Sequence, residues 1–132
     1  MDKITLRPED KAELAAVVGR LWESAHGAPV GTVCVLIGAD SLAVLIKNVL
    51  SPAERVAARR DEGQALVQRY AEQLLATLAP ELRTLIESFT GRRVISTSGY
   101  ADTAAGHVLC FCILGKVLGS PDPGVGVEPI NA

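Results

Sequence analysis

The sequence has few aromatic residues and no strong excess of charge of either sign. Aromatic residues make up 4% of the 132 positions, and the formal net charge at pH 7 is −2. A chain without a broad basic field is poorly suited to nucleic acid, so we expect no nucleic-acid partner. The longest clean apolar run covers residues 108–114, far short of the roughly 20 residues that a spanning helix needs. We therefore expect no direct membrane insertion.

Cysteine is also scarce, with three in the chain. An odd number of cysteines without a secretory signal is typical of a reducing compartment. We expect a cytoplasmic protein that associates with a membrane only through a partner.

Aliphatic residues are abundant instead. Hydrophobic residues make up 48% of the chain, and because aromatic residues are few, this content is mainly alanine, valine, leucine and isoleucine. The length is typical of one domain and allows a core without metal or disulfides. A small domain with this much apolar content is expected to bury some apolar surface between subunits. We expect a homodimer or a higher homo-oligomer.

The first third of the chain predicts a helix followed by a hairpin. Residues 8–25 form the predicted helix, because Pro8 suits the first helical position and Gly27 suits the stop. Two strands are predicted over residues 32–37 and 42–50. Both are apolar almost throughout rather than alternating. This pattern predicts that a helix or a partner covers each face of the sheet.

A capping box, "SPAE", opens the central helix. Ser51 should accept from the third helical amide, and Glu54 should reach back to the Ser51 amide. Residues 52–90 are predicted as one helix that Gly63 weakens and Pro80 kinks. A straight helix of that length would measure about 58 Å, against a radius of gyration of about 14 Å for the domain. It must bend, break or protrude, and a protruding stretch would need a second copy as its partner.

The last part of the chain predicts a second hairpin and a tail. Strands are predicted over residues 94–98 and 107–114, separated by a turn. The order is α-β-β-α-β-β, an α+β class with a four-stranded, mainly antiparallel sheet packed by the first helix and the kinked central helix. Residues 1–118 are predicted as a single domain, and residues 119–132, rich in proline and glycine, as a flexible tail.

Arginines near the start of the central helix suggest an anion site. Free amides at a helix start attract anions, and Arg55 could add charge beside Ser51. Arg92 and Arg93 could contribute from the segment before the third strand. The competing interpretation is a structural cap with a solvated face, because Ser51 and Glu54 already satisfy the free amides.

Four residues are candidates for a protein contact. Trp22 lies on the apolar stripe of the first helix, where core packing and partner docking both remain open. Arg59 and Arg60 follow the capping box, and the acids after them can neutralise their charge locally. Tyr70 lies on the apolar stripe of the central helix.

Three cysteines are weak candidates for a metal site. Cys110 and Cys112 should share one face of a strand, and Cys34 could complete a zinc site if its strand lay beside them. Free cysteines are usually buried core residues, so we expect neither metal nor cofactor. No serine or cysteine motif flanks His26 or His107, so we also expect no enzyme activity.

Five short motifs resemble those of one family. They are "LSPAER" at residues 50–55, "EG" at 62–63, "PEL" with "IE" at 80–82 and 86–87, "TGRRV" at 90–94, and "FCIL" at 111–114. In this order and spacing, residues 8–114 resemble the MpsC family. The family is named for a bacterial sodium-translocating, membrane-potential-generating system, whose other components are linked to ion and inorganic-carbon uptake. The resemblance implies a partner in a membrane transport system and carries over no catalytic residue.

Two classes of function follow from the sequence. The first is a non-catalytic cytoplasmic accessory protein that self-associates and binds a partner in an ion or inorganic-carbon transport system. The alternative is a small-anion or ligand sensor that uses the helix start at Ser51 and the nearby arginines.

Overall fold

The computed structural model describes residues 6–119. Its elements confirm the α+β class and the expected alternation of helices and strands, with the central helix in two parts. Their bounds are α1 Pro8–His26, β1 Val33–Ile37, β2 Ser41–Lys47, α2 Pro52–Ala57, α3 Asp61–Thr90, β3 Arg92–Asp102 and β4 His107–Val117. The predicted tail, beyond residue 119, lies outside the described residues.

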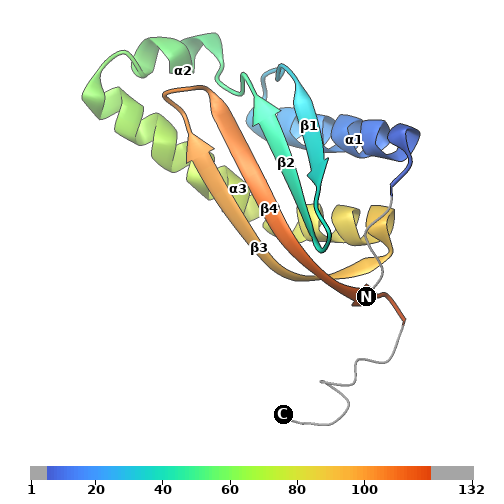
Figure 1. Ribbon diagram of the computed structural model, residues 1–132. Coiled ribbons are helices and arrows are strands. Elements are labelled where there is room, and N and C mark those ends of the chain that lie inside the picture. The colour runs from blue at the N-terminus through green and yellow to red at the C-terminus, as the bar shows by residue number, and fades with distance from the viewer. Residues whose placement is uncertain (1–5, 120–132) are drawn as a thin grey trace, which may run out of the picture.

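The four strands form one antiparallel sheet in the order β1-β2-β4-β3. Each hairpin pairs neighbours in the sequence, and the two hairpins join where β2 pairs with β4 (Figure 1). Three strand ends differ from the prediction by three residues or more, among them the end of β4, which continues to Val117 instead of stopping at Leu114. β2 ends at Lys47, because Asn48 takes a positive φ of 56°. β3 is longer than expected, since Gly99 and Tyr100 continue to pair with β4 instead of forming a turn.

The core lies between one face of the sheet and the helices. In Figure 1, α1 and α3 both lie behind the sheet. Leu14 and Trp22 of α1 and Ile86 of α3 are almost completely buried. Alternate residues of β2 and β4, such as Val44 and Cys112, face the helices and complete the core. This packing places the opposite face of the sheet away from both helices.

The central helix breaks near its start, so the prediction of a single helix over residues 52–90 is wrong. α2 ends at Ala57, and α3 begins at Asp61. Gly63 lies so close to the Ala57 carbonyl that an added Cβ would overlap it. α3 then continues through Pro80, which is exposed. The turn at residues 58–60 separates the short α2 from α3, which remains a continuous helix of 30 residues.

No helix among residues 6–119 is both long and apolar enough to span a bilayer.

Candidate functional site

The capping box is present as the sequence predicted. The Ser51 hydroxyl accepts from the Glu54 amide at 3.2 Å, and the Glu54 carboxylate accepts from the Ser51 amide at 2.8 Å. Pro52 occupies the first turn of α2. The Ser51 and Glu54 amides, which a bound anion could use, therefore already donate to the chain's own side chains.

A buried histidine completes this cap, and sequence reasoning missed it. His26 Nε2 lies 2.7 Å from the Glu54 carboxylate, and the His26 side chain is 5% exposed. The His26 ring also lies between Trp22 and Tyr70, with ring centroids 6.1 and 5.9 Å away. The pair joins the end of α1 to the start of α2. Its partners are 28 residues apart, so only the folded chain reveals it.

The four residues of the candidate anion site do not come together. Ser51 and Arg55 lie at the end of the sheet where Lys47 pairs with His107. Arg92 begins β3, at the opposite end of the sheet from Asp102 and His107. At about 3.3 Å per residue, the two ends of β3 are roughly 33 Å apart. At its end, Arg92 is buried, and its Nε donates to the Gly115 carbonyl at 2.6 Å. Arg93, next in sequence, belongs to that same end.

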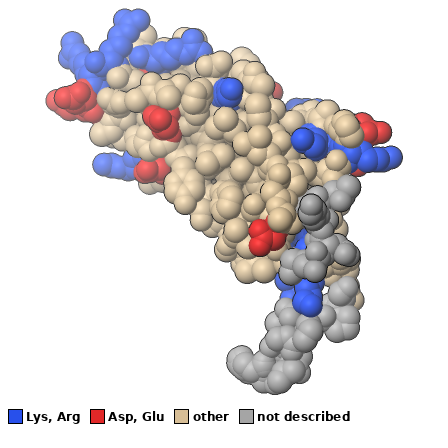
Figure 2. All heavy atoms as spheres, in the orientation of Figure 1, with Lys and Arg blue, Asp and Glu red and all other residues tan. Residues whose placement is uncertain are grey.

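The four candidate contact residues lie in different environments. Trp22 is 2% exposed and belongs to the core. Arg59 and Arg60 are exposed in the turn between α2 and α3, and Tyr70 is 43% exposed. Figure 2 shows basic side chains gathered at the α2 end of the molecule.

The three cysteines lie on both sides of the sheet. Cys110 and Cys112 are buried on the face that packs against the helices. Cys34 pairs across to Leu45 on the opposite face. A hydrogen bond between the two buried thiols, together with burial, raises the pKa of Cys112, while the same bond lowers the pKa of Cys110. Within residues 6–119, no group of three or more His, Cys, Asp or Glu residues could hold a metal ion.

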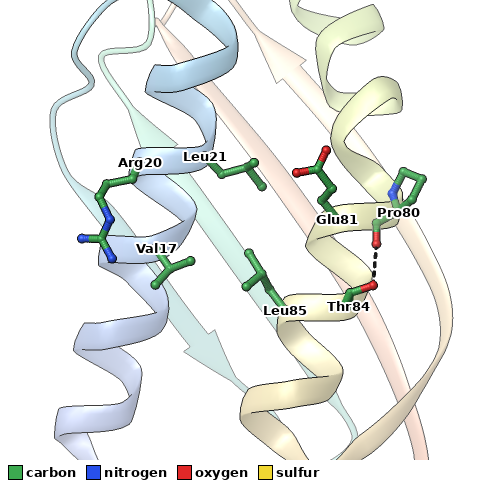
Figure 3. Close-up of a pocket in the computed structure, with 7 residues that line it drawn as sticks. All are labelled: Val17, Arg20, Leu21, Pro80, Glu81, Thr84 and Leu85. Carbon is green, nitrogen blue, oxygen red and sulfur yellow. Dashed lines mark hydrogen bonds between the residues drawn. The ribbon is translucent and has the colours of Figure 1, made fainter.

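A shallow groove of about 600 Å³ runs between α1 and α3. Its lining residues are Val17, Arg20, Leu21, Pro80, Glu81, Thr84 and Leu85. Figure 3 shows Leu21 and Leu85 pointing into the space between the helices, whereas Arg20 points away from α3. The groove is a continuation of the helix packing and is mainly apolar.

The largest unusual feature is the uncovered face of the sheet. Within residues 6–119, both long helices pack on the other face (Figure 1). Leu36, Ile95 and Tyr100 are 57%, 60% and 59% exposed on the uncovered face. Leu109 and Phe111 lie half-buried between them on β4. We call these residues and their neighbours on this side the open face.

Charged side chains are sparse over the open face. Figure 2, which views the molecule from this side, shows few charged groups over the strands. Lys47, His107 and Asp102 pair across the end of the sheet near α2. The sequence did indicate this surface, since the two strands of the first hairpin are apolar on both sides.

One family model covers most of the chain. The model, described as Na+-translocating membrane potential-generating system (MpsC), matches residues 9–116. The chain belongs to the MpsC family. The match takes in both long helices and nearly all of the sheet, so the open face is part of the MpsC region. No curated protein and no solved structure shows a significant match to the chain.

Proposed function

We propose that this MpsC-family chain is a non-catalytic, cytoplasmic accessory protein that self-associates and binds a protein partner of a membrane ion-transport system. The family's description associates it with a Na+-translocating, membrane-potential-generating system. The proposal assigns partner binding to the open face.

The size of the open face carries the proposal. With strands about 4.8 Å apart and about 3.4 Å per residue, the four strands cover roughly 550 Å². A standard protein interface buries about 800 Å² on each partner. One open face therefore supplies most of one side of such an interface, provided that a partner covers it.

The placement of the chemically reactive residues supports a role without catalysis. The His26–Glu54 pair holds the start of a helix, with both side chains largely buried. Cys110 and Cys112 lie inside the core. These groups stabilise the fold, whereas general acid–base or nucleophilic chemistry needs a substrate within hydrogen-bond reach of the reacting group.

Affinity purification from native cells tests the proposal. We expect the wild-type chain to recover integral membrane proteins of an ion-transport system when membranes are solubilised with mild detergent. The variant Leu36→Glu/Leu45→Glu should lose them, because two carboxylates on an apolar contact would have to be desolvated without partners. Both side chains point away from the core, so the fold should be kept.

The matched control is Leu66→Glu, at a leucine that is 62% exposed on α3. It adds one carboxylate outside the open face, against two on that face in the double variant, and should leave recovery unchanged. The proposal fails if the wild type recovers no membrane protein, or if the two variants reduce recovery equally.

A further inference from the structure

The two edges of the sheet differ in how they are protected. β1 is a short edge of five residues, while β3 is an edge of eleven residues. Natural proteins protect long edges with lysine, proline or a covering element, because the unpaired backbone invites another strand. The stretch Ser96–Tyr100 of β3, "STSGY", has no charge and no proline.

Side chains from α3 cap both ends of this edge. Glu87 accepts from the Val94 amide at 2.9 Å. Gln68 donates to the Ala101 carbonyl at 2.6 Å. Thr97 and Gly99 lie between these caps. Backbone N–H and C=O groups point to the same side of a strand at every second residue. Because the Ala101 carbonyl points outward from the sheet, the backbone groups of Gly99 and Thr97 point outward as well. No strand of residues 6–119 pairs with this side of β3.

A recess of about 250 Å³ lies beside this open stretch of the edge. Thr97, Ser98 and Gly99 form one wall. α3 forms the other, with the exposed Glu72 and Ala76, the half-buried Ala79 and the buried Leu75 and Leu82. Ala76 and Ala79 have small side chains, so this side of the helix projects little toward a neighbouring chain. The recess is smaller than the roughly 300–1,000 Å³ of small-molecule pockets, and it suits close approach of another polypeptide.

The charges on this side of α3 are self-complementary about its centre. Glu72 lines one end of the recess. Arg83, exposed, follows Ala79 at helical spacing and lies at the other end, about 16 Å away along the axis. The midpoint of these two charges falls between residues 77 and 78, which is also the midpoint of the Gln68 and Glu87 caps. On β3, the corresponding midpoint lies beside Ser98.

We propose that the β3 edge binds the β3 edge of a second copy of this chain around a two-fold axis near Ser98. Thr97 of each copy would exchange backbone hydrogen bonds with Gly99 of the other, as in a regular antiparallel ladder. The same axis brings Glu72 of one copy opposite Arg83 of the other, twice. The two sheets become one, and the two open faces become continuous. This inference specifies the self-association in the proposed function and rests on it.

Charge reversal tests the pairing of Glu72 with Arg83. Glu72→Arg and Arg83→Glu should each raise the dimer dissociation constant at least about tenfold, because each replaces two attractions with two repulsions. An equimolar mixture of the two variants should restore a heterodimer, since opposite charges then meet at both contacts. Sedimentation velocity and native mass spectrometry measure the two effects. The matched control, Glu81→Arg, reverses an exposed charge on the α1 side of the same helix and should change nothing.

Several outcomes would overturn the edge dimer. They are a monomeric wild type at tens of micromolar, single reversals that leave the dissociation constant unchanged, and a mixture that fails to restore association. Loss of the dimer in Leu36→Glu/Leu45→Glu alone would place the second copy on the open face instead. Loss of membrane-protein recovery with the dimer intact leaves this inference standing and contradicts only the partner-binding proposal.

Discussion

At the scale of single residues, Glu54 has two roles at once. Its carboxylate accepts from the Ser51 amide and from His26, so it caps α2 and holds α2 to α1. A lost cap typically costs about 1 kcal/mol of folding free energy, and a lost hydrogen bond to a charged group costs about 1.5–3 kcal/mol. We therefore expect Glu54→Ala to lower the free energy of unfolding by roughly 2–4 kcal/mol in urea titrations.

The control for this prediction is Glu54→Gln, which keeps an acceptor at the same place. It should cost clearly less than the alanine variant. A double-mutant cycle with His26→Ala gives the coupling between the two side chains, which we expect to exceed about 0.5 kcal/mol. Equal costs for Ala and Gln would contradict the double role.

Thiol reactivity should separate the three cysteines. Cys34 lies half-buried on the open face, while Cys110 and Cys112 lie in the core.

The raised pKa of Cys112 favours its neutral thiol in the folded state. The neutral Cys112 thiol therefore contributes stability that is fully present below the ordinary thiol pKa of about 8.5. This stability is lost as the pH rises from there toward the pKa of Cys112 in the folded chain. At pH 8, we expect a chromogenic disulfide reagent to modify one thiol per native chain and three per unfolded chain.

The variant Cys34→Ser identifies the reactive group. It should remove the reaction of the native chain and leave two thiols that react after unfolding. Rapid native-state reaction in this variant would show that the buried pair is accessible.

At the scale of elements, the turn between α2 and α3 depends on one glycine. Helix propensity alone predicts that Gly63→Ala gains about 1 kcal/mol. The structure reverses the sign, because a Cβ at this position overlaps the Ala57 carbonyl. We expect the variant to lose at least about 1 kcal/mol of unfolding free energy, as overpacked sites do, measured by thermal or denaturant unfolding.

Ser88→Ala is a suitable control, since Ser88 is exposed in the same helix. It should be neutral or slightly stabilising, as propensity predicts. A stabilising Gly63→Ala would mean that the sharp turn is not held as the structure shows.

Local sequence patterns were sufficient to predict most elements but not the turn within the central helix. The capping box, the glycine stop after α1 and the hairpin order depend on neighbours in sequence, and they are all present. The break at residues 58–60 lies one turn before Gly63, whose role depends on a contact with Ala57 across the turn. No large apolar residue lies between Val56 and Leu66, so the apolar pattern gave no sign of the break and one helix was predicted.

The site was harder to predict than the fold, for the same physical reason. Apolar strands indicated that both sheet faces need cover, and this points directly to the open face. The His26–Glu54 contact joins separate elements. The separation of Ser51 from Arg92 follows from the pairing register, which no local pattern encodes.

At the scale of the whole molecule, hydrogen exchange can locate the dimer contact without mutation. The amides of Thr97 and Gly99 point outward from the sheet, so pairing with a second copy should slow their exchange as the protein concentration rises. The Val94 amide is an internal reference, because Glu87 holds it within the same chain at 2.9 Å. Its exchange should not depend on concentration. Concentration-independent exchange at Thr97 and Gly99 would contradict edge pairing.

The order of strands also determines how the chain can assemble during synthesis. The first hairpin, with α1, is complete once Lys47 has been made, but β2 acquires its second neighbour only when β4 follows. Until then a nascent chain presents an unpaired apolar strand, which is vulnerable to mispairing. The sharp turn at residues 58–60 divides the chain into two halves that meet along β2 and β4. A hinge between complementary halves is the arrangement that allows two chains to exchange them by domain swapping.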